Sequence, residues 1–171
     1  MSEINFRVLE KFDANLLDIL KKLEIENLGS NAAINEWQIP VIIRYGKFIT
    51  AELHSGEIIG ICEIIREWKE CRAAFIHSFY IKEKFRNRGL GRGLLAYTIK
   101  MLIEEGFESV ELTVDLENKL AVNLYKGFGF EIKEFRPNEY GRGINRHLMI
   151  LKLKERIGDS YVNKRATCKN D

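Results

Sequence analysis

The chain has 171 residues, of which 46% are hydrophobic and 30% charged, and this composition predicts one globular domain rather than a disordered or fibrous protein. Its 27 lysines and arginines and 25 aspartates and glutamates give a net charge of +2, which is too balanced for a protein whose main partner is nucleic acid or an anionic membrane. No apolar run approaches the roughly 18 residues of a membrane span, and residues 1–7 lack the core of a signal peptide, so we expect a cytoplasmic protein.

The first half of the chain predicts a strand, a helix and a group of antiparallel strands. Residues 5–9 form the expected first strand, and Asp13 is a suitable N-cap for a helix that carries leucines at helical spacing and ends near Gly29. Residues 30–46 are apolar without a clean period and contain Pro40, which indicates a mobile or partly helical segment. Three antiparallel strands are then expected over residues 47–53, 57–68 and 72–82.

The second half of the chain alternates helices and strands. Apolar pairs recur every four residues over 94–103 and predict a long amphipathic helix that ends at Gly106. The remaining expected elements are a strand over 109–115, a helix over 118–128, and strands over 130–135 and 146–154. Because no linker or repeat divides them, we expect one domain over residues 1–154, followed by a polar tail over 155–171.

The three cysteines, Cys62, Cys71 and Cys168, show neither CxxC nor Cys/His metal spacing. An odd number of cysteines without such spacing predicts neither a disulfide framework nor a metal site. We interpret all three as packing or surface thiols.

A basic, glycine-rich loop lies between the third antiparallel strand and the long helix. Residues 82–93 read KEKFRNRGLGRG, with five basic residues between Lys82 and Arg92. At a helix N-terminus, unpaired backbone N–H groups and the helix dipole favour an anion, and glycines let it approach the backbone. The loop is therefore expected to bind a phosphate or pyrophosphate; a glycine turn with a solvated basic face is the alternative. The P-loop pattern is absent, and the dinucleotide pattern GxGxxG fails at Leu94.

Two motifs in this order carry a family resemblance. The loop reads Arg86-Asn87-Arg88-Gly89-Leu90-Gly91 and follows Phe79-Tyr80-Ile81, and about 25 residues later comes Asn118-x-x-Ala121-x-x-Leu124-Tyr125-x-x-Phe128-Gly129-Phe130. The sequence thereby resembles the GNAT superfamily of acyl-CoA N-acyltransferases, whose pyrophosphate loop reads Arg/Gln-x-x-Gly-x-Gly/Ala. The resemblance implies an α/β (α+β) fold: a single GNAT-like domain with a mixed, mostly antiparallel twisted sheet of six to seven strands, helices on both faces, and a central splay between the fourth and fifth strands.

The resemblance also implies a site for acetyl-CoA, without a metal. Pantetheine would lie in the splay and pair with backbone at Phe79 and Ile81, and Asn118 would touch the pantetheine arm. Tyr125 would face the thioester sulfur as the general acid, although periodicity alone favours a core aromatic there. The cofactor-binding residues implied by the family are Phe79, Ile81, Arg86, Asn87, Arg88, Gly89, Leu90, Gly91, Arg92, Gly93, Asn118 and Tyr125, with the amides of Arg88 to Gly93 on the pyrophosphate.

The general base is less clearly marked in the sequence. His77 matches the position of a proton-relay histidine in the arylalkylamine acetyltransferases of this family; a satisfied sheet histidine is the alternative. Other members use a strand glutamate, but two such positions here are Phe75 and Thr113. Glu63, Glu111 and Asp115 remain as carboxylates on neighbouring strands, where alternation favours a solvated face.

The resemblance implies an acetyl-CoA-dependent N-acetyltransferase. Direct attack in a ternary complex is expected because no cysteine or serine stands out as a covalent acyl carrier. A CoA-binding sensor or interaction module with little or no turnover is the alternative, and nucleic-acid binding through residues 82–92 is disfavoured by the net charge. The acceptor, a small-molecule or protein amine, would lie over residues 26–45 and 140–143, and a homodimer stays open.

Overall fold

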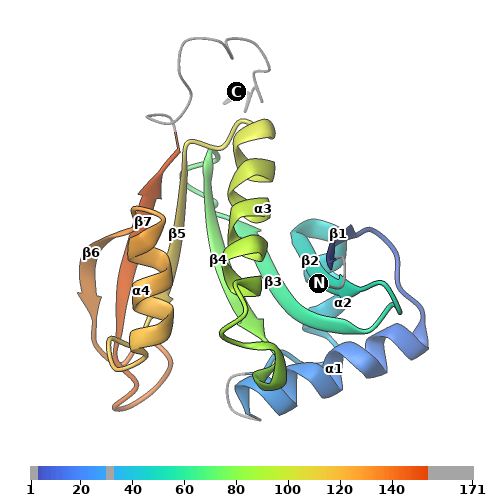
Figure 1. The fold of residues 1–171 in the computed structure, drawn as a ribbon. Helices are drawn as coiled ribbons and strands as arrows, with labels where there is room; N and C mark the ends of the chain where they lie inside the picture. Colours follow the sequence, from blue (N-terminus) through green and yellow to red (C-terminus); the bar gives the residue numbers. More distant parts are fainter. Residues whose placement is uncertain (1–3, 30–32, 154–171) are drawn as a thin grey trace. The chain divides into compact units, whose positions relative to one another are not determined.

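The structure is a computed structural model that describes residues 4–29 and 33–153 (Figure 1). In chain order the elements are β1 (Ile4–Leu9), α1 (Ala14–Leu28), α2 (Gln38–Tyr45), β2 (Lys47–Leu53), β3 (Ile58–Arg66), β4 (Ala73–Ile81), the short 3-10 helix η1 (Glu83–Phe85), α3 (Leu90–Glu104), β5 (Ser109–Val114), α4 (Lys119–Gly127), β6 (Glu131–Arg136) and β7 (Arg146–Lys152). The order of strands and helices is the predicted one, although the strands expected to end at residues 68 and 154 end at 66 and 152. The tail over 155–171 and Cys168 lie outside the described residues.

Helix α1 begins and ends where its sequence signals predict. The Asp13 carboxylate accepts a hydrogen bond from the backbone N–H of Leu16 at 2.8 Å, which satisfies one of the unpaired donors of the first turn. At the other end Gly29 has φ of 78°, a conformation that suits glycine, and its N–H donates to the carbonyl of Ile25. Leu20 and Leu23 are buried on the inner face of the helix.

The segment expected to be mobile or partly helical contains the short helix α2. The side chain of Asn35 accepts hydrogen bonds from the N–H groups of Trp37 and Gln38 at 2.9 and 3.2 Å, which fixes the start of the helix. Pro40 lies in the first turn, where a missing N–H costs little. The periodicity is obscured because the exposed side carries the apolar residues Val41 and Tyr45. Residues 30–32 of the segment lie outside the described part.

The seven strands form one mixed sheet in the order β1-β2-β3-β4-β5-β7-β6. β1 pairs with β2, β2 with β3, β5 with β7 and β6 with β7, all antiparallel, whereas β4 and β5 are parallel. The β4–β5 register runs from Ala73 opposite Ser109 to Ile76 opposite Leu112, although both strands continue beyond it. The predicted mixed sheet and its splay between the fourth and fifth strands are confirmed.

The chain divides into two compact units, and β4 and α3 each contribute to both. The first contains β1 to β3, α1, α2 and the stretch Ser78–Thr98, with a core that includes Leu20, Ile39, Ile43, Phe48 and Ile61. The second contains Arg66–His77 and the chain from Ile99 onward, and its sheet buries Val110, Leu112, Leu148, Met149 and Leu151. The glycine-rich loop belongs to the first unit, and Tyr125 belongs to the second.

The cap of α1 gives a stability prediction. Asp13→Ala removes the acceptor for the Leu16 N–H and should lower the free energy of unfolding by about 1 kcal/mol, which corresponds to roughly 2–4 °C in Tm. Asp13→Asn keeps an acceptor oxygen and serves as the control. Thermal unfolding followed by circular dichroism measures both, and equal Tm values for all three proteins would show that the cap contributes nothing.

Candidate cofactor and active site

The loop between β4 and α3 is held in shape by its own side chains and backbone. The Phe85 N–H donates to the carbonyl of Lys82 at 2.8 Å, which closes η1. The Arg86 side chain turns back, and its Nε donates to the carbonyl of Ile81 at 2.9 Å. Asn87 has φ of 60°. These features turn the chain from the end of β4 into the start of α3.

The first turn of α3 presents backbone donors. The Gly93 N–H donates to the carbonyl of Gly89 at 3.0 Å, so the helical ladder begins there, and the amides of Leu90 and Gly91 have no acceptor one turn earlier. Gly89 has φ of 77°, and a Cβ placed on it would meet no atom within 4 Å. Open space therefore lies against this backbone, and the helix dipole makes it favourable for an anion. A pyrophosphate fits these residues.

Gly93 differs from the other glycines of the loop. Its N–H is already donated to Gly89, and a Cβ on Gly93 would come within 3.0 Å of the Phe6 ring. Phe6 also packs on Tyr97, with ring centres 5.6 Å apart. A glycine at position 93 lets α3 pack closely against β1, a different function from the expected contact between its amide and the pyrophosphate.

The five basic residues of the loop have different partners. Lys82 and Lys84 both contact the carboxylate of Glu57, at 3.1 and 2.9 Å, and these two ammonium groups hold the Glu57 pKa below its ordinary value. Lys82 and Lys84 also line an open depression of about 530 Å³ together with Glu26 and Glu83, and these two carboxylates balance the charge of the lysines. The guanidinium of Arg88 lies 5.7 Å from the Phe85 ring centre. Sequence reasoning counted five cations, but Glu57 compensates two of them.

The second motif forms α4. The side-chain oxygen Oδ1 of Asn118 accepts a hydrogen bond from the N–H of Ala121 at 3.2 Å and caps the helix. This leaves the side-chain NH₂ as the group able to reach a ligand. Tyr125 is 6% exposed, and its ring centre lies 5.6 Å from that of Phe130. Burial of the ring fits both interpretations of Tyr125, the core aromatic and the general acid.

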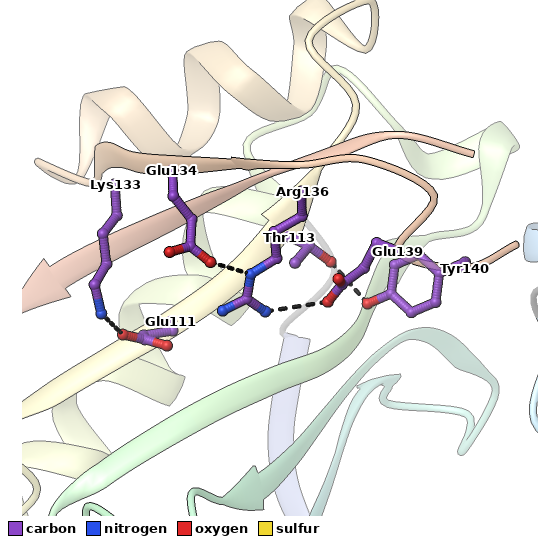
Figure 2. Close-up of polar contacts among 7 residues, drawn as sticks. All are labelled: Glu111, Thr113, Lys133, Glu134, Arg136, Glu139 and Tyr140. Atoms are coloured by element: carbon purple, nitrogen blue, oxygen red, sulfur yellow. Dashed lines mark hydrogen bonds and ion pairs between the residues drawn. The ribbon is translucent and has the colours of Figure 1, made fainter. Parts of the chain in front are cut away.

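The candidate bases occupy different environments. His77 is exposed on β4, between the buried Ile76 and Ser78. The Glu111 carboxylate accepts from Lys133 Nζ at 2.8 Å (Figure 2), and Asp115 pairs with Arg146 at 3.5 Å. Both of these carboxylates are therefore partly neutralised.

Glu63 corrects one expectation. Its alternation in the sequence favoured a solvated face, but β3 is buried on both faces from Ile58 to Ile64, and Glu63 is 0% exposed. The strand is central in the sheet, between β2 and β4, which explains the burial.

Sequence reasoning missed a second buried carboxylate, Glu24. It is 0% exposed, and its Oε2 accepts a hydrogen bond from the backbone N–H of Ile34 at 3.2 Å. Burial, and then the neighbouring Glu24, raise the pKa of the Tyr80 hydroxyl. Glu24 thus ties the segment before α2 to α1. A signal was present, because Glu24 follows the buried Leu20 by four residues and so continues the inner face of the helix.

Cys62 is a poor candidate for a covalent acyl carrier. Cys62 is buried, and burial raises the pKa of its thiol to about 12, so that the nucleophilic thiolate is scarce at neutral pH. Cys71 is partly exposed.

Within the described residues no helix is both long enough and apolar enough to span a membrane.

A comparison of the sequence with protein-family models finds a match that includes the glycine-rich loop and α4. The family model described as "Acetyltransferase (GNAT) family" matches residues 16–130, more than half of the chain. The chain belongs to the GNAT acetyltransferase family.

Individual relatives share different parts of the chain. An uncharacterized N-acetyltransferase of Methanocaldococcus jannaschii is 38% identical over 91 residues, which is 51% of this chain and 40% of that protein. The L-methionine sulfoximine/L-methionine sulfone acetyltransferase of Pseudomonas paraeruginosa is 26% identical over 82% of this chain and 92% of its own. The ribosomal-protein-S18-alanine N-acetyltransferase of Escherichia coli shares the fold, with a TM-score of 0.73 at 17% identity over 94% of this chain and 100% of its own.

The loop geometry predicts how substitutions change CoA binding. Gly89→Val places a side chain in the open space beside the α3 amides and should abolish the rise in Tm that CoA produces. Gly56→Val is the matched control, because Gly56 also has positive φ, 85°, and nothing within 4 Å, and so carries the same backbone strain. Gly91→Val, inside α3, tests the site without positive-φ strain. A normal CoA-induced shift in both loop variants would refute the site.

Proposed function

We propose that the protein is an acetyl-CoA-dependent N-acetyltransferase that moves the acetyl group to a primary amine by direct attack in a ternary complex, in the cytoplasm. The carrying observation is the start of α3, where the amides of Leu90 and Gly91 have no backbone acceptor one turn earlier and open space lies beside Gly89. Family membership supplies the reaction class. The buried, weakly acidic thiol of Cys62 supports direct transfer over a cysteine-bound intermediate.

Acetyl-CoA contacts the glycine-rich loop, the end of β4 and the start of α4 in this proposal. The amides of Arg88 to Arg92 hold the pyrophosphate, with Arg86 and Asn87 fixing the turn that presents them. Backbone groups of Phe79 and Ile81 pair with pantetheine, in the part of β4 that extends past its register with β5. The Asn118 side-chain NH₂ contacts the pantetheine arm. Bound in this way, acetyl-CoA supplies an activated acetyl thioester.

Tyr125 is proposed as the group that stabilises the departing thiolate. A phenol with an ordinary pKa of about 10 is protonated at pH 7. A thiolate, whose conjugate acid has a pKa near 8.5, is a weaker base than the phenolate that proton transfer would leave. Full proton transfer is then uphill by roughly 2 kcal/mol, so the hydroxyl acts at least in part by donating a hydrogen bond to sulfur.

Tyr125→Phe should therefore lower kcat by about 10- to 10³-fold while acetyl-CoA binding changes little, because the hydroxyl acts on charge that develops during the reaction. Thiol release measures kcat, and the CoA-induced shift in Tm measures binding. Parental turnover in the variant would return Tyr125 to the core-packing interpretation that its contact with Phe130 also allows.

His77 is proposed to take the amine proton, directly or through water. An alkylamine with a pKa of about 10.4 is neutral in fewer than one molecule in about 10³ at pH 7, so removal of its proton is part of the reaction. His77 is exposed and therefore accessible to water. Glu111 and Asp115 are weaker candidates, because each is paired with a cation.

The pH dependence of kcat/KM distinguishes the ionisation of His77 from that of the acceptor amine. Histidine titrates near pH 6.5, so kcat/KM should rise over about pH 6–8 if His77 must be neutral. Acceptors of different amine pKa should leave this limb in place, and His77→Gln should erase it and slow the reaction. A limb that moves with the acceptor, together with parental rates in the variant, would make His77 a structural residue.

The acceptor class is tested by a screen. Amino acids and their sulfone or sulfoximine analogues, other small amines and peptide N-termini are each incubated with acetyl-CoA, and free thiol is measured. The Pseudomonas relative motivates the amino-acid group. Acetylated product with at least one amine supports the proposal. CoA binding without thiol release for every amine would instead favour a CoA-binding sensor.

A further inference from the structure

The loop between β6 and β7, residues 137–145, contacts the strand β5, which does not adjoin β6. The strand order is β5-β7-β6, so β7 separates β5 from β6. The Tyr140 hydroxyl in this loop is nevertheless 2.8 Å from the Thr113 hydroxyl on β5 (Figure 2). Thr113 is opposite Leu148 of β7 in the register. Through the Tyr140 side chain the loop therefore reaches β5, on the face that carries Thr113.

Residues 139 and 140 are held at several points. Arg136 on β6 donates to the Glu139 carboxylate at 3.1 Å and also contacts Glu134 (Figure 2). The guanidinium of Arg146 on β7 lies 5.8 Å from the Tyr140 ring centre. With the bond to Thr113, contacts to β6, β7 and β5 converge on this pair of residues. Tyr140 contacts β5 through its hydrogen bond with Thr113.

The tip of the loop is shaped by bonds within the loop itself. The side-chain oxygen of Asn138 accepts from the Gly143 N–H at 2.7 Å, and the backbone carbonyl of Asn138 accepts from the Gly141 N–H at 3.1 Å. Gly141 and Gly143 have φ of 120° and 82°, and Arg142 between them is exposed. The tip is thus a preformed turn whose orientation over the sheet depends on the anchored residues before it.

We propose that Thr113 is a positioning residue of the acceptor site, because its hydroxyl holds Tyr140 and through it the 137–145 loop. This inference rests on the proposed function and on the expectation from the sequence that the acceptor lies over residues 26–45 and 140–143. A threonine hydroxyl is not a base at neutral pH, but it can serve as donor or as acceptor in the hydrogen bond with Tyr140. Strand position 113 therefore orients the loop and does not take the amine proton.

The first test needs no substrate. Thr113→Val keeps the shape and strand preference of threonine and removes the hydroxyl. Trypsin should then cleave the folded protein after Arg142 about fivefold faster, the effect of losing one solvent-accessible hydrogen bond. Thr113→Ser retains the hydroxyl and should stay within about twofold of the parent. Lys133→Gln is the control, because it breaks the neighbouring pair with Glu111, which does not hold the loop.

The second test measures kinetics with an acceptor from the screen. Thr113→Val should raise the acceptor KM by about three- to tenfold, while kcat and the acetyl-CoA KM stay within about twofold, because the loop orients only the acceptor. Tyr140→Phe should give the same KM change, and the double variant should be no worse than either single one, because both remove one interaction.

The outcomes separate this inference from the proposed function. Parental cleavage and KM in Thr113→Val, equal defects in the serine and valine variants, or additive effects in the double variant would each overturn the positioning function of Thr113. Thiol release that is absent from the parental protein with every amine would overturn the proposed function and the acceptor part of the inference. The cleavage rates would still decide whether Thr113 holds the loop.

Discussion

The backbone amides at the start of α3 are the feature on which the rest of the proposed site depends. The amides of Leu90 and Gly91 have no backbone acceptor one turn earlier, because the ladder begins with the bond from Gly93 to Gly89. The chain reaches this point only through a tight turn that Arg86 closes onto Ile81 and that places Gly89 at positive φ. In the proposed function an anion bound here would replace the missing acceptors, so that the pyrophosphate would fix one end of acetyl-CoA and the acetyl group would be positioned from that end.

Local features of the fold could be predicted from the sequence because their determinants lie within a few residues. Asp13 caps α1 three residues before its hydrogen-bond donor, and the glycine loop lies between a strand and a helix that are each strongly periodic. The splay between β4 and β5 was expected from the family resemblance, and the register confirms it. Helix α2 was only partly predicted, because Val41 and Tyr45 on its exposed side obscure the period.

Features that depend on contacts between distant residues could not be predicted. Glu63 is buried because β3 is central in the sheet, and alternation along one strand does not show which neighbours cover it. Glu57 neutralises Lys82 and Lys84 from 25 and 27 residues away, so a count of cations in the loop overstated its charge. The contact of Thr113 with Tyr140 joins residues 27 apart across an intervening strand, and neither residue carries a signal for the other.

NMR can test whether the amides at the start of α3 bind the pyrophosphate of CoA. Backbone ¹H–¹⁵N spectra of the full chain, recorded while CoA is added, report each amide separately. We expect the largest shift changes on residues 88–92, with slowed amide exchange at Leu90 and Gly91, because these groups gain an acceptor. Saturable CoA binding with unchanged amides at residues 88–92 would contradict this expectation.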